Sequence, residues 1–136
     1  MVEKAEKNVA KAGLEKRITI RQGNATNLPF EDKSFHAAIA LLVLHHILGY
    51  ERAIKEVYRV LKDRGMFVVL EFGWNKSAVF RIGSLFFPPA HWISKEELLA
   101  SLKENGFKIE RSRDHGFGLA SIIALKQQLH ELLAFN

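Results

Sequence analysis

Two apolar runs with an amphipathic segment between them constrain the fold of this sequence more than any other feature. The runs extend from Ala37 to Leu44 and from Met66 to Phe72. Apolar runs of this length are typical of parallel strands that are buried on both faces. The segment from Tyr50 to Leu61 repeats its apolar residues at helical spacing. The order strand, helix, strand predicts a right-handed crossover within an α/β sheet.

The segments on either side of this unit predict further helices and strands. Residues 1 to 12 carry the apolar stripe of an amphipathic helix, and residues 17 to 21 alternate polar and apolar side chains, as an edge strand does. Ser94 and Glu97 have the spacing of a capping box at the start of a helix. Strands joined by a hairpin turn, and then a short terminal helix, are expected at residues 107–113, 119–126 and 127–135.

Residues 22 to 65 resemble a segment of class I S-adenosylmethionine-dependent methyltransferases of the ubiquinone/menaquinone-methylase type. The sequence reads Q-G-N-A-T-N-L-P-F-E-D-K-S-F-H, followed by L-H-H and R-V-L-K-D-R-G. The family pattern is G-D-A-x-x-L-P-F-x-D-x-S-F-D, followed by L-H-H and R-V-L-K-P-G-G. The resemblance is specific as far as Phe72 and looser beyond it.

The resemblance implies the fold class. That class is α/β, a truncated Rossmann-like class I methyltransferase sheet with helices on both faces and a C-terminal antiparallel hairpin. Residues 1 to 136 are then a single methyltransferase-like domain, the C-terminal part of the family fold.

The resemblance also implies S-adenosylmethionine as the cofactor and indicates four positions that bind it. An acidic residue at the position of Asn24 accepts a hydrogen bond from the adenine amino group in the family, and the next N–H, here that of Ala25, meets a ring nitrogen. Asn24 retains a carbonyl acceptor; alternatively, Asn24 and Thr26 merely satisfy polar groups of the loop backbone. Ala40 and Leu41 lie at the carboxyl end of the central strand, where ligands bind in open α/β sheets.

No catalytic residue and no metal site are predicted. The sulfonium of the cofactor is already activated, so methyl transfer depends mainly on proximity and orientation. His36 is expected to be an exposed residue at a strand end rather than a base. His45 and His46 are adjacent on the chain, which directs their side chains about 100° apart on a helix and disfavours a shared zinc ion.

The glycine-rich part of the family's cofactor site has no counterpart in this sequence. The nearest match to G-x-G-x-G is Gly116-x-Gly118, in the predicted hairpin turn. Without the family's first two strands, the strand at residues 37–44 becomes an exposed apolar edge, which favours pairing. The strand at residues 17–21 can pair with it, or a second copy can complete the sheet as a homodimer. A third possibility is that the sequence is a fragment that starts at an internal methionine of a longer protein.

The family resemblance thus predicts methyl transfer to a small or apolar acceptor. Because the glycine-rich loop is missing, the 136-residue chain is expected to be incomplete or inactive as an enzyme by itself. The acceptor pocket would involve residues 73–92, which are rich in aromatic side chains; a packed connecting helix or a dimer contact is the alternative there. The alternative function for the whole chain is a non-catalytic module that dimerises or binds a partner through the exposed sheet edge.

Composition narrows the class of partner. The net charge is +5, but basic residues lie beside acidic ones, as in Lys55-Glu56, which argues against a nucleic-acid partner. A small-molecule partner is what the family resemblance implies. The longest apolar run is too short to span a bilayer. Because the chain has no cysteine, a cytoplasmic location is expected.

Overall fold

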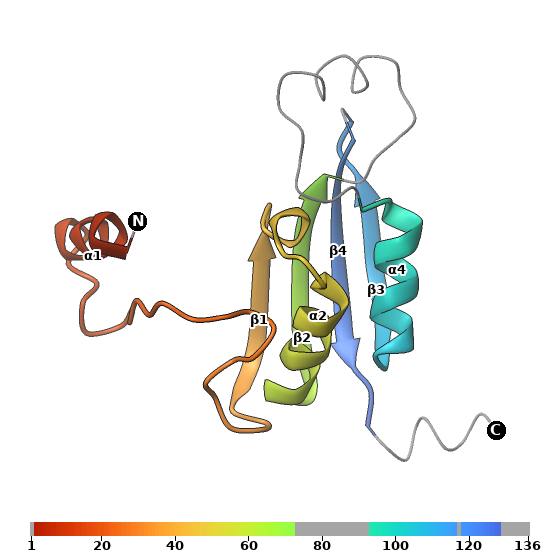
Figure 1. Cartoon of the computed structure of the whole chain (residues 1–136), viewed down its shortest axis with the longest axis horizontal. Coiled ribbons are helices and arrows are strands. Elements are labelled where there is room, and N and C mark those ends of the chain that lie inside the picture. Colours follow the sequence, from red (N-terminus) through yellow and green to blue (C-terminus); the bar gives the residue numbers. More distant parts are fainter. Residues whose placement is uncertain (1, 73–92, 117, 129–136) are drawn as a thin grey trace.

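The computed structural model describes residues 2–72, 93–116 and 118–128, which form one mixed four-stranded sheet and three α-helices (Figure 1). The strands lie in the order β1-β2-β4-β3. In chain order the elements are α1 (Val2–Lys11), β1 (Phe35–Leu41), the 3-10 turn η1 (Leu44–His46), α2 (Tyr50–Val60), β2 (Leu61–Phe72), α4 (Lys95–Glu104), β3 (Phe107–Asp114) and β4 (Leu119–Lys126).

The sheet has the topology that the sequence predicts. Strand β1 pairs in parallel with β2, and α2 connects the two strands as the crossover helix. Strands β3 and β4 form the antiparallel hairpin, and β4 pairs antiparallel with β2. The α/β, Rossmann-like fold class with a C-terminal hairpin is therefore confirmed. The extent of a single domain over residues 1–136 stays a prediction.

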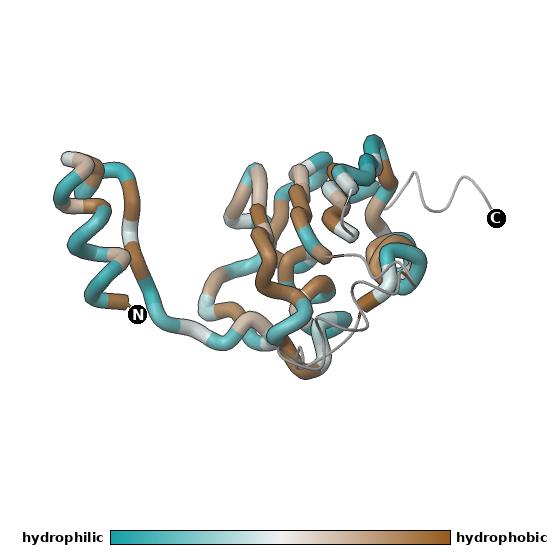
Figure 2. The backbone as a smooth tube through the Cα atoms, turned by 90° about the horizontal axis from the view of Figure 1, so that it is seen from above, coloured by the Kyte–Doolittle hydropathy of each residue, from teal (hydrophilic) through white to brown (hydrophobic). Residues whose placement is uncertain are grey.

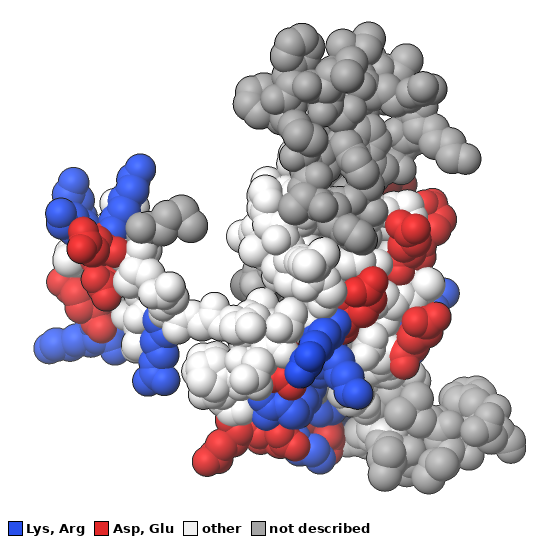
Figure 3. Space-filling model, in the orientation of Figure 1, with Lys and Arg blue, Asp and Glu red and all other residues white. Residues whose placement is uncertain are grey.

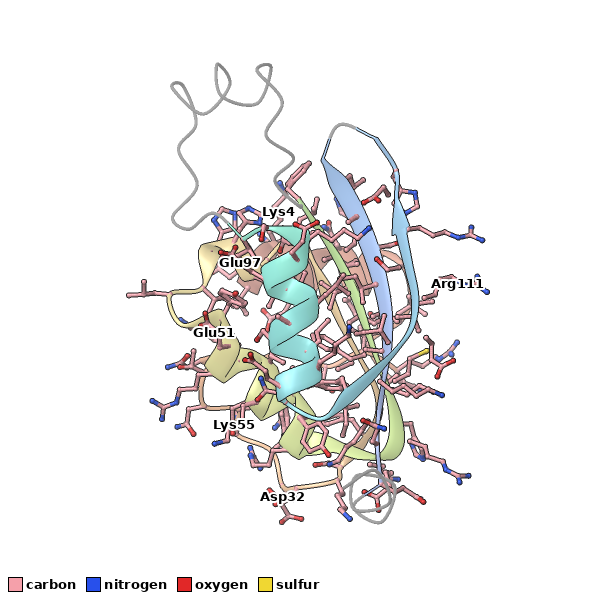
Figure 4. The ribbon with its side chains drawn as sticks, turned by 90° about the vertical axis from the view of Figure 1, so that its right-hand side faces the viewer. Lys4, Asp32, Glu51, Lys55, Glu97 and Arg111 are labelled. Atoms are coloured by element: carbon pink, nitrogen blue, oxygen red, sulfur yellow. The ribbon has the colours of Figure 1, made fainter. Side chains whose placement is uncertain are left out.

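Helices α2 and α4 cover one face of this sheet, and the core lies beneath them (Figure 4). Every second residue of β2 and β4 points into this core, together with apolar residues of the two helices: Phe67, Val69, Ile122, Ala124, Ile54, Leu98 and Leu102. The predicted capping box starts α4. Ser94 Oγ accepts a hydrogen bond from Glu97 N at 3.1 Å, and Ser94 N donates to Glu97 Oε2 at 2.8 Å.

The second face of the sheet presents apolar side chains to solvent. Ile39 and Leu41 of β1 are 66% and 59% exposed, and Met66 and Phe72 of β2 are also exposed. Among the described residues no helix covers this face. Helix α1 buries none of its residues and stands apart from the sheet, at the end of an extended arm (Figures 1 and 2).

Two sequence-based predictions about strands are wrong. The strand predicted at residues 37–44 ends at Leu41, and within β1, which is described throughout, Ala40 is the only buried residue. Burial on both faces needs a layer on each side, and α1 does not supply the second layer. Residues 17–21 form no strand, because alternation of side chains yields a strand only where a neighbouring strand accepts its hydrogen bonds.

Two predicted segments fall largely or wholly outside the described residues. These are the terminal helix at residues 127–135, of which residues 127–128 are described and are not helical, and the segment at residues 73–92.

Candidate functional site

The carboxyl ends of β1 and β2 form the candidate site. The strands are parallel, so both ends meet at one edge of the sheet, where Leu41 lies opposite Leu70. Leu42 N then donates a hydrogen bond to Leu70 O at 2.8 Å while the backbone of Leu42 takes a left-handed conformation, with φ at 50°. This turn carries the chain into η1, across the ends of the strands. Ligands of open α/β sheets bind at such ends.

Ala40 and Leu41 both lie at this edge but face opposite sides of the sheet. Ala40 is buried toward the helices, whereas the side chain of Leu41 extends over the open face. Neither side chain carries a polar atom, so any polar contact to a ligand here has to come from the backbone or from neighbouring residues. Their role in cofactor binding stays a prediction.

Asn24 and Ala25 lie in the loop that precedes β1. Asn24 Oδ1 accepts hydrogen bonds from both Thr26 N and Thr26 Oγ1 at 2.9 Å, and Asn27 N donates to Asn24 O at 3.0 Å. The side-chain oxygen of Asn24 is thus engaged within its own loop, which is the alternative that the sequence left open. No hydrogen bond of the described chain joins this loop to Ala40 or Leu41.

An ion pair on α2 holds the next part of this loop. Arg59 bonds Glu56 through two nitrogen atoms, at 2.8 and 2.9 Å, and also donates to Leu28 O, Phe30 O and Asp32 Oδ1. Leu28 N donates to Glu56 Oε2 at 2.8 Å. The pair therefore binds both the N–H and the C=O of Leu28, as a neighbouring strand would do. These contacts connect the L-P-F-E-D segment to the R-V-L-K segment.

Glu56 is acidified by these contacts. The hydrogen bonds from Arg59 outweigh partial burial, and together with the bond from Leu28 N they lower the pKa of Glu56 to about 2. The R-V-L-K segment alone did not predict this role for Arg59. An acid and an arginine three residues apart on the helix were the available signal.

A second pair lies directly at the ends of the strands. Glu71 is buried within β2, and its carboxylate accepts hydrogen bonds from Leu44 N at 2.8 Å and Phe72 N at 2.9 Å. His45 Nδ1 lies 2.5 Å from Glu71 Oε1, and His45 N is 3.4 Å from Oε2. The carboxylate of Glu71 within the otherwise apolar run at residues 66–72 was the signal in the sequence for this contact.

Apolar side chains surround this pair. Leu41, Leu42 and Val43 follow one another at the end of β1 and are exposed, as is Phe72 at the end of β2. Figure 3 shows that charged side chains gather over α2 and the loop beside it, whereas the surface at the carboxyl end of β1 is free of charge in this view. The site thus combines an apolar rim with one imidazole–carboxylate pair, in which Glu71 is buried and His45 is partly buried.

The described residues hold no cluster of three or more histidine, aspartate or glutamate side chains that could bind a metal ion. His36 is exposed, and its Nε2 lies 3.1 Å from Lys62 Nζ. None of the helices in the described ranges has the length and apolar character needed to cross a membrane.

Comparison with known proteins identifies the family of this chain. The family model described as "Methyltransferase domain" matches residues 1–69, about half of the chain. A demethylmenaquinone methyltransferase from Desulfitobacterium hafniense is 39% identical over 83 residues, covering 61% of this chain and 33% of the relative. The ubiquinone/menaquinone biosynthesis C-methyltransferase of Brucella canis is 28% identical, covering 82% of this chain and 51% of the relative. The chain thus spans between a third and half of the length of these relatives.

Solved structures show the same fold. The [4+2]-cyclase SpnF has a TM-score of 0.78 at 24% identity, covering 93% of this chain and 63% of that chain. A S-adenosylmethionine-dependent methyltransferase from Methanosarcina mazei has a TM-score of 0.72 at 27% identity, covering 93% and 77%. On the matched family model, the chain belongs to the methyltransferase domain family, and in sequence and fold it is similar to class I S-adenosylmethionine-dependent methyltransferases of the ubiquinone/menaquinone type.

Proposed function

We propose that this chain supplies the acceptor side of a S-adenosylmethionine-dependent methyltransferase site, with a small, apolar methyl acceptor. The apolar rim at the ends of β1 and β2 is the observation that supports this proposal. Apolar pockets with few polar groups are typical of sites for small molecules. The names of two relatives, which specify demethylmenaquinone, are consistent with an apolar ring as the acceptor. The absence of cysteine keeps the cytoplasm as the proposed location.

The residues present fit the cofactor in part. Asn24 Oδ1 is already bonded to Thr26, so it can accept a bond from an adenine amino group only if the loop turn opens. No glycine-rich G-x-G-x-G loop stands in the sequence to approach the rest of the cofactor. We therefore expect the 136-residue chain to bind S-adenosylmethionine weakly and to be incomplete as a catalyst by itself.

Two titrations test this proposal. Calorimetry with S-adenosylmethionine should give a dissociation constant in the millimolar range, and Asn24→Ala should weaken binding further. Binding in the micromolar range, insensitive to Asn24→Ala, would contradict an incomplete site.

NMR titration with 1,4-naphthoquinone should shift the signals of Leu42 and Phe72 saturably. Leu42→Gln should weaken this binding and the control Leu48→Gln should leave it unchanged; no saturation would contradict an apolar acceptor site.

A second function, a non-catalytic module that dimerises, is favoured by a different observation. Strand β1 ends the sheet in the described structure, and Ile39 and Leu41 expose apolar side chains beside that edge. Exposed apolar edges promote pairing with another chain. Ile39→Lys should then convert a dimer into a monomer in light scattering. The control Leu48→Lys changes a residue that is 84% exposed but lies outside the strands, and should leave the dimer intact. A monomeric wild-type chain would contradict this second function.

A further inference from the structure

The uncovered face of the sheet carries apolar side chains well beyond the site at its edge. Side chains alternate between the two faces along a strand, so residues that pair across strands share a face. Ile39 lies opposite Val68, and Val68 lies opposite Ile123. The apolar side chains that line this face, none of them buried, are Ile39, Leu41, Met66, Val68, Ile123 and Leu125. Contiguous apolar surface that no other element covers marks a site of interaction.

Strand β3 adds basic side chains to the same face. Ser112 lies opposite the core residue Ile122, so the residues before and after it, Arg111 and Arg113, direct their side chains to the uncovered face. Both arginines are exposed, and Figure 4 shows Arg111 extending from β3 away from the helices. The face is therefore apolar over β1, β2 and β4 and cationic along β3.

This positive charge has no acidic counterpart on the face. Within the described ranges, the side chains of Arg111 and Arg113 make no ion pair or hydrogen bond. Lys108 Nζ lies 3.2 Å from Glu110 Oε1, which balances that lysine. The other acidic residues of β2 and β3 have partners of their own: Asp63, Glu71 and Asp114. Two free guanidinium groups beside an apolar surface complement a partner that is both anionic and apolar.

The width of the face distinguishes between a helix and a bilayer as this partner. Neighbouring strands lie about 4.8 Å apart, so four strands span roughly 15 Å. A single helix with its side chains is about 10 Å across and covers only part of that width. A bilayer surface covers the whole face at once. Apolar side chains then enter the boundary between headgroups and acyl chains, while arginine side chains keep their charged groups at the level of the lipid phosphates.

We propose that the uncovered sheet face, with Arg111 and Arg113 along its margin, binds the surface of a bilayer that contains anionic lipids. The apolar residues supply contact with the acyl boundary, and the two arginines supply the preference for anionic headgroups. Leu41 and Phe72 belong both to this face and to the rim of the candidate site, so a bound bilayer lies beside that site. The inference goes beyond methyl transfer and does not rest on it.

Sedimentation of the full chain with lipid vesicles tests the role of charge. Vesicles of phosphatidylcholine mixed with phosphatidylglycerol should bind the protein, and vesicles of phosphatidylcholine alone should bind it far less. Added salt should weaken binding to the mixed vesicles. An arginine near an anionic surface strengthens binding about fivefold, so the double variant Arg111→Gln/Arg113→Gln should bind roughly 30-fold more weakly.

The matched control for this test is the double variant Arg52→Gln/Lys55→Gln. It removes the same charge from exposed positions of α2, on the covered side of the sheet, and should bind close to wild type. No binding of the wild type to the mixed vesicles, or equal losses for the two double variants, would overturn the proposal.

NMR in bicelles of the same two lipids tests the apolar side of the face with the unaltered protein. A nitroxide on the lipid acyl chain, close to the headgroup, should broaden the methyl signals of Ile39 and Met66. The methyl signals of Leu99 in α4, on the covered side, should keep their width. Equal broadening of all three residues, or broadening of none, would overturn the proposal. A dimer that binds no vesicles and that Ile39→Lys dissociates would assign the face to a second copy of the chain and would overturn it as well.

Discussion

At the scale of single residues, the Glu56–Arg59 pair shows how two sequence motifs become one structural unit. Arg59 donates to carbonyl groups of the loop at residues 28–32, while Glu56 accepts from Leu28 N. Neither motif predicts the contact by itself, because the loop and the helix are far apart in sequence. The contact explains why a loop without regular structure is held in one conformation against α2.

Replacing Arg59 with methionine should lower the free energy of unfolding, since the hydrogen bonds to the charged guanidinium would be lost and Glu56 would lose its main partner. The free energy of unfolding in urea is the measurement. Arg52→Met is the control, because Arg52 is an exposed residue of the same helix. Equal free energies for the two variants would show that the contacts of Arg59 contribute nothing measurable.

The pH dependence of the free energy of unfolding should reveal the lowered pKa of Glu56. Its pKa is lowered to about 2 in the folded state, against about 4.3 in an unfolded chain. A lowered pKa stabilises the fold fully above the unfolded value, and this contribution is lost as pH falls through the folded value. The difference in unfolding free energy between wild type and Glu56→Gln should be constant above about pH 5 and shrink toward pH 2. A difference that stays constant down to pH 2 would contradict the assignment.

At the scale of helices and strands, the sequence correctly predicted those elements whose signals lie in neighbouring residues. The Ser94–Glu97 capping box and the hairpin of β3 and β4 are where the sequence indicates, because caps and turns depend on neighbouring residues. Residues 17–21 and the buried faces of β1 were mispredicted, because pairing and burial depend on distant elements. The His45–Glu71 pair was missed for the same reason, since its residues are 26 positions apart.

The turn between α4 and β3 permits a sharp prediction. Gly106 has φ at 86°, and a Cβ there would lie 3.0 Å from the ring of Tyr58, which packs edge-on against Phe107. Gly106→Ala should therefore destabilise the protein by about 2–3 kcal/mol, from backbone strain and the clash together. Gly116→Ala is the control: φ is 81° there, but a Cβ would meet nothing within 4 Å, so about 1 kcal/mol of strain is expected. Thermal unfolding of both variants gives the comparison, and equal losses would mean that Tyr58 moves aside freely.

At the scale of the whole molecule, the core has one covered side and one open side. Figure 4 shows Glu51 and Lys55 on the helical side, while Arg111 extends from β3 on the opposite side of the sheet. The buried residues that connect α2 and α4 to the sheet, including Ile54 and Leu102, lie on the helical side. Helix α1 adds no buried residue. Stability should therefore depend on the covered side and be independent of α1.

Deletion of residues 1–12 tests this division of the molecule. Because α1 buries nothing, the shortened chain should unfold within about 0.5 kcal/mol of the full chain, as expected for surface changes. Leu102→Ala is the reference, since this leucine is completely buried and its truncation should cost about 2–5 kcal/mol. Both measurements belong at protein concentrations where light scattering finds the monomer, so that pairing between copies adds nothing. A loss on deletion comparable with that of Leu102→Ala would mean that α1 packs onto the open face in solution, and the apolar side chains of Ile39 and Leu41 would then be covered rather than available to a second chain.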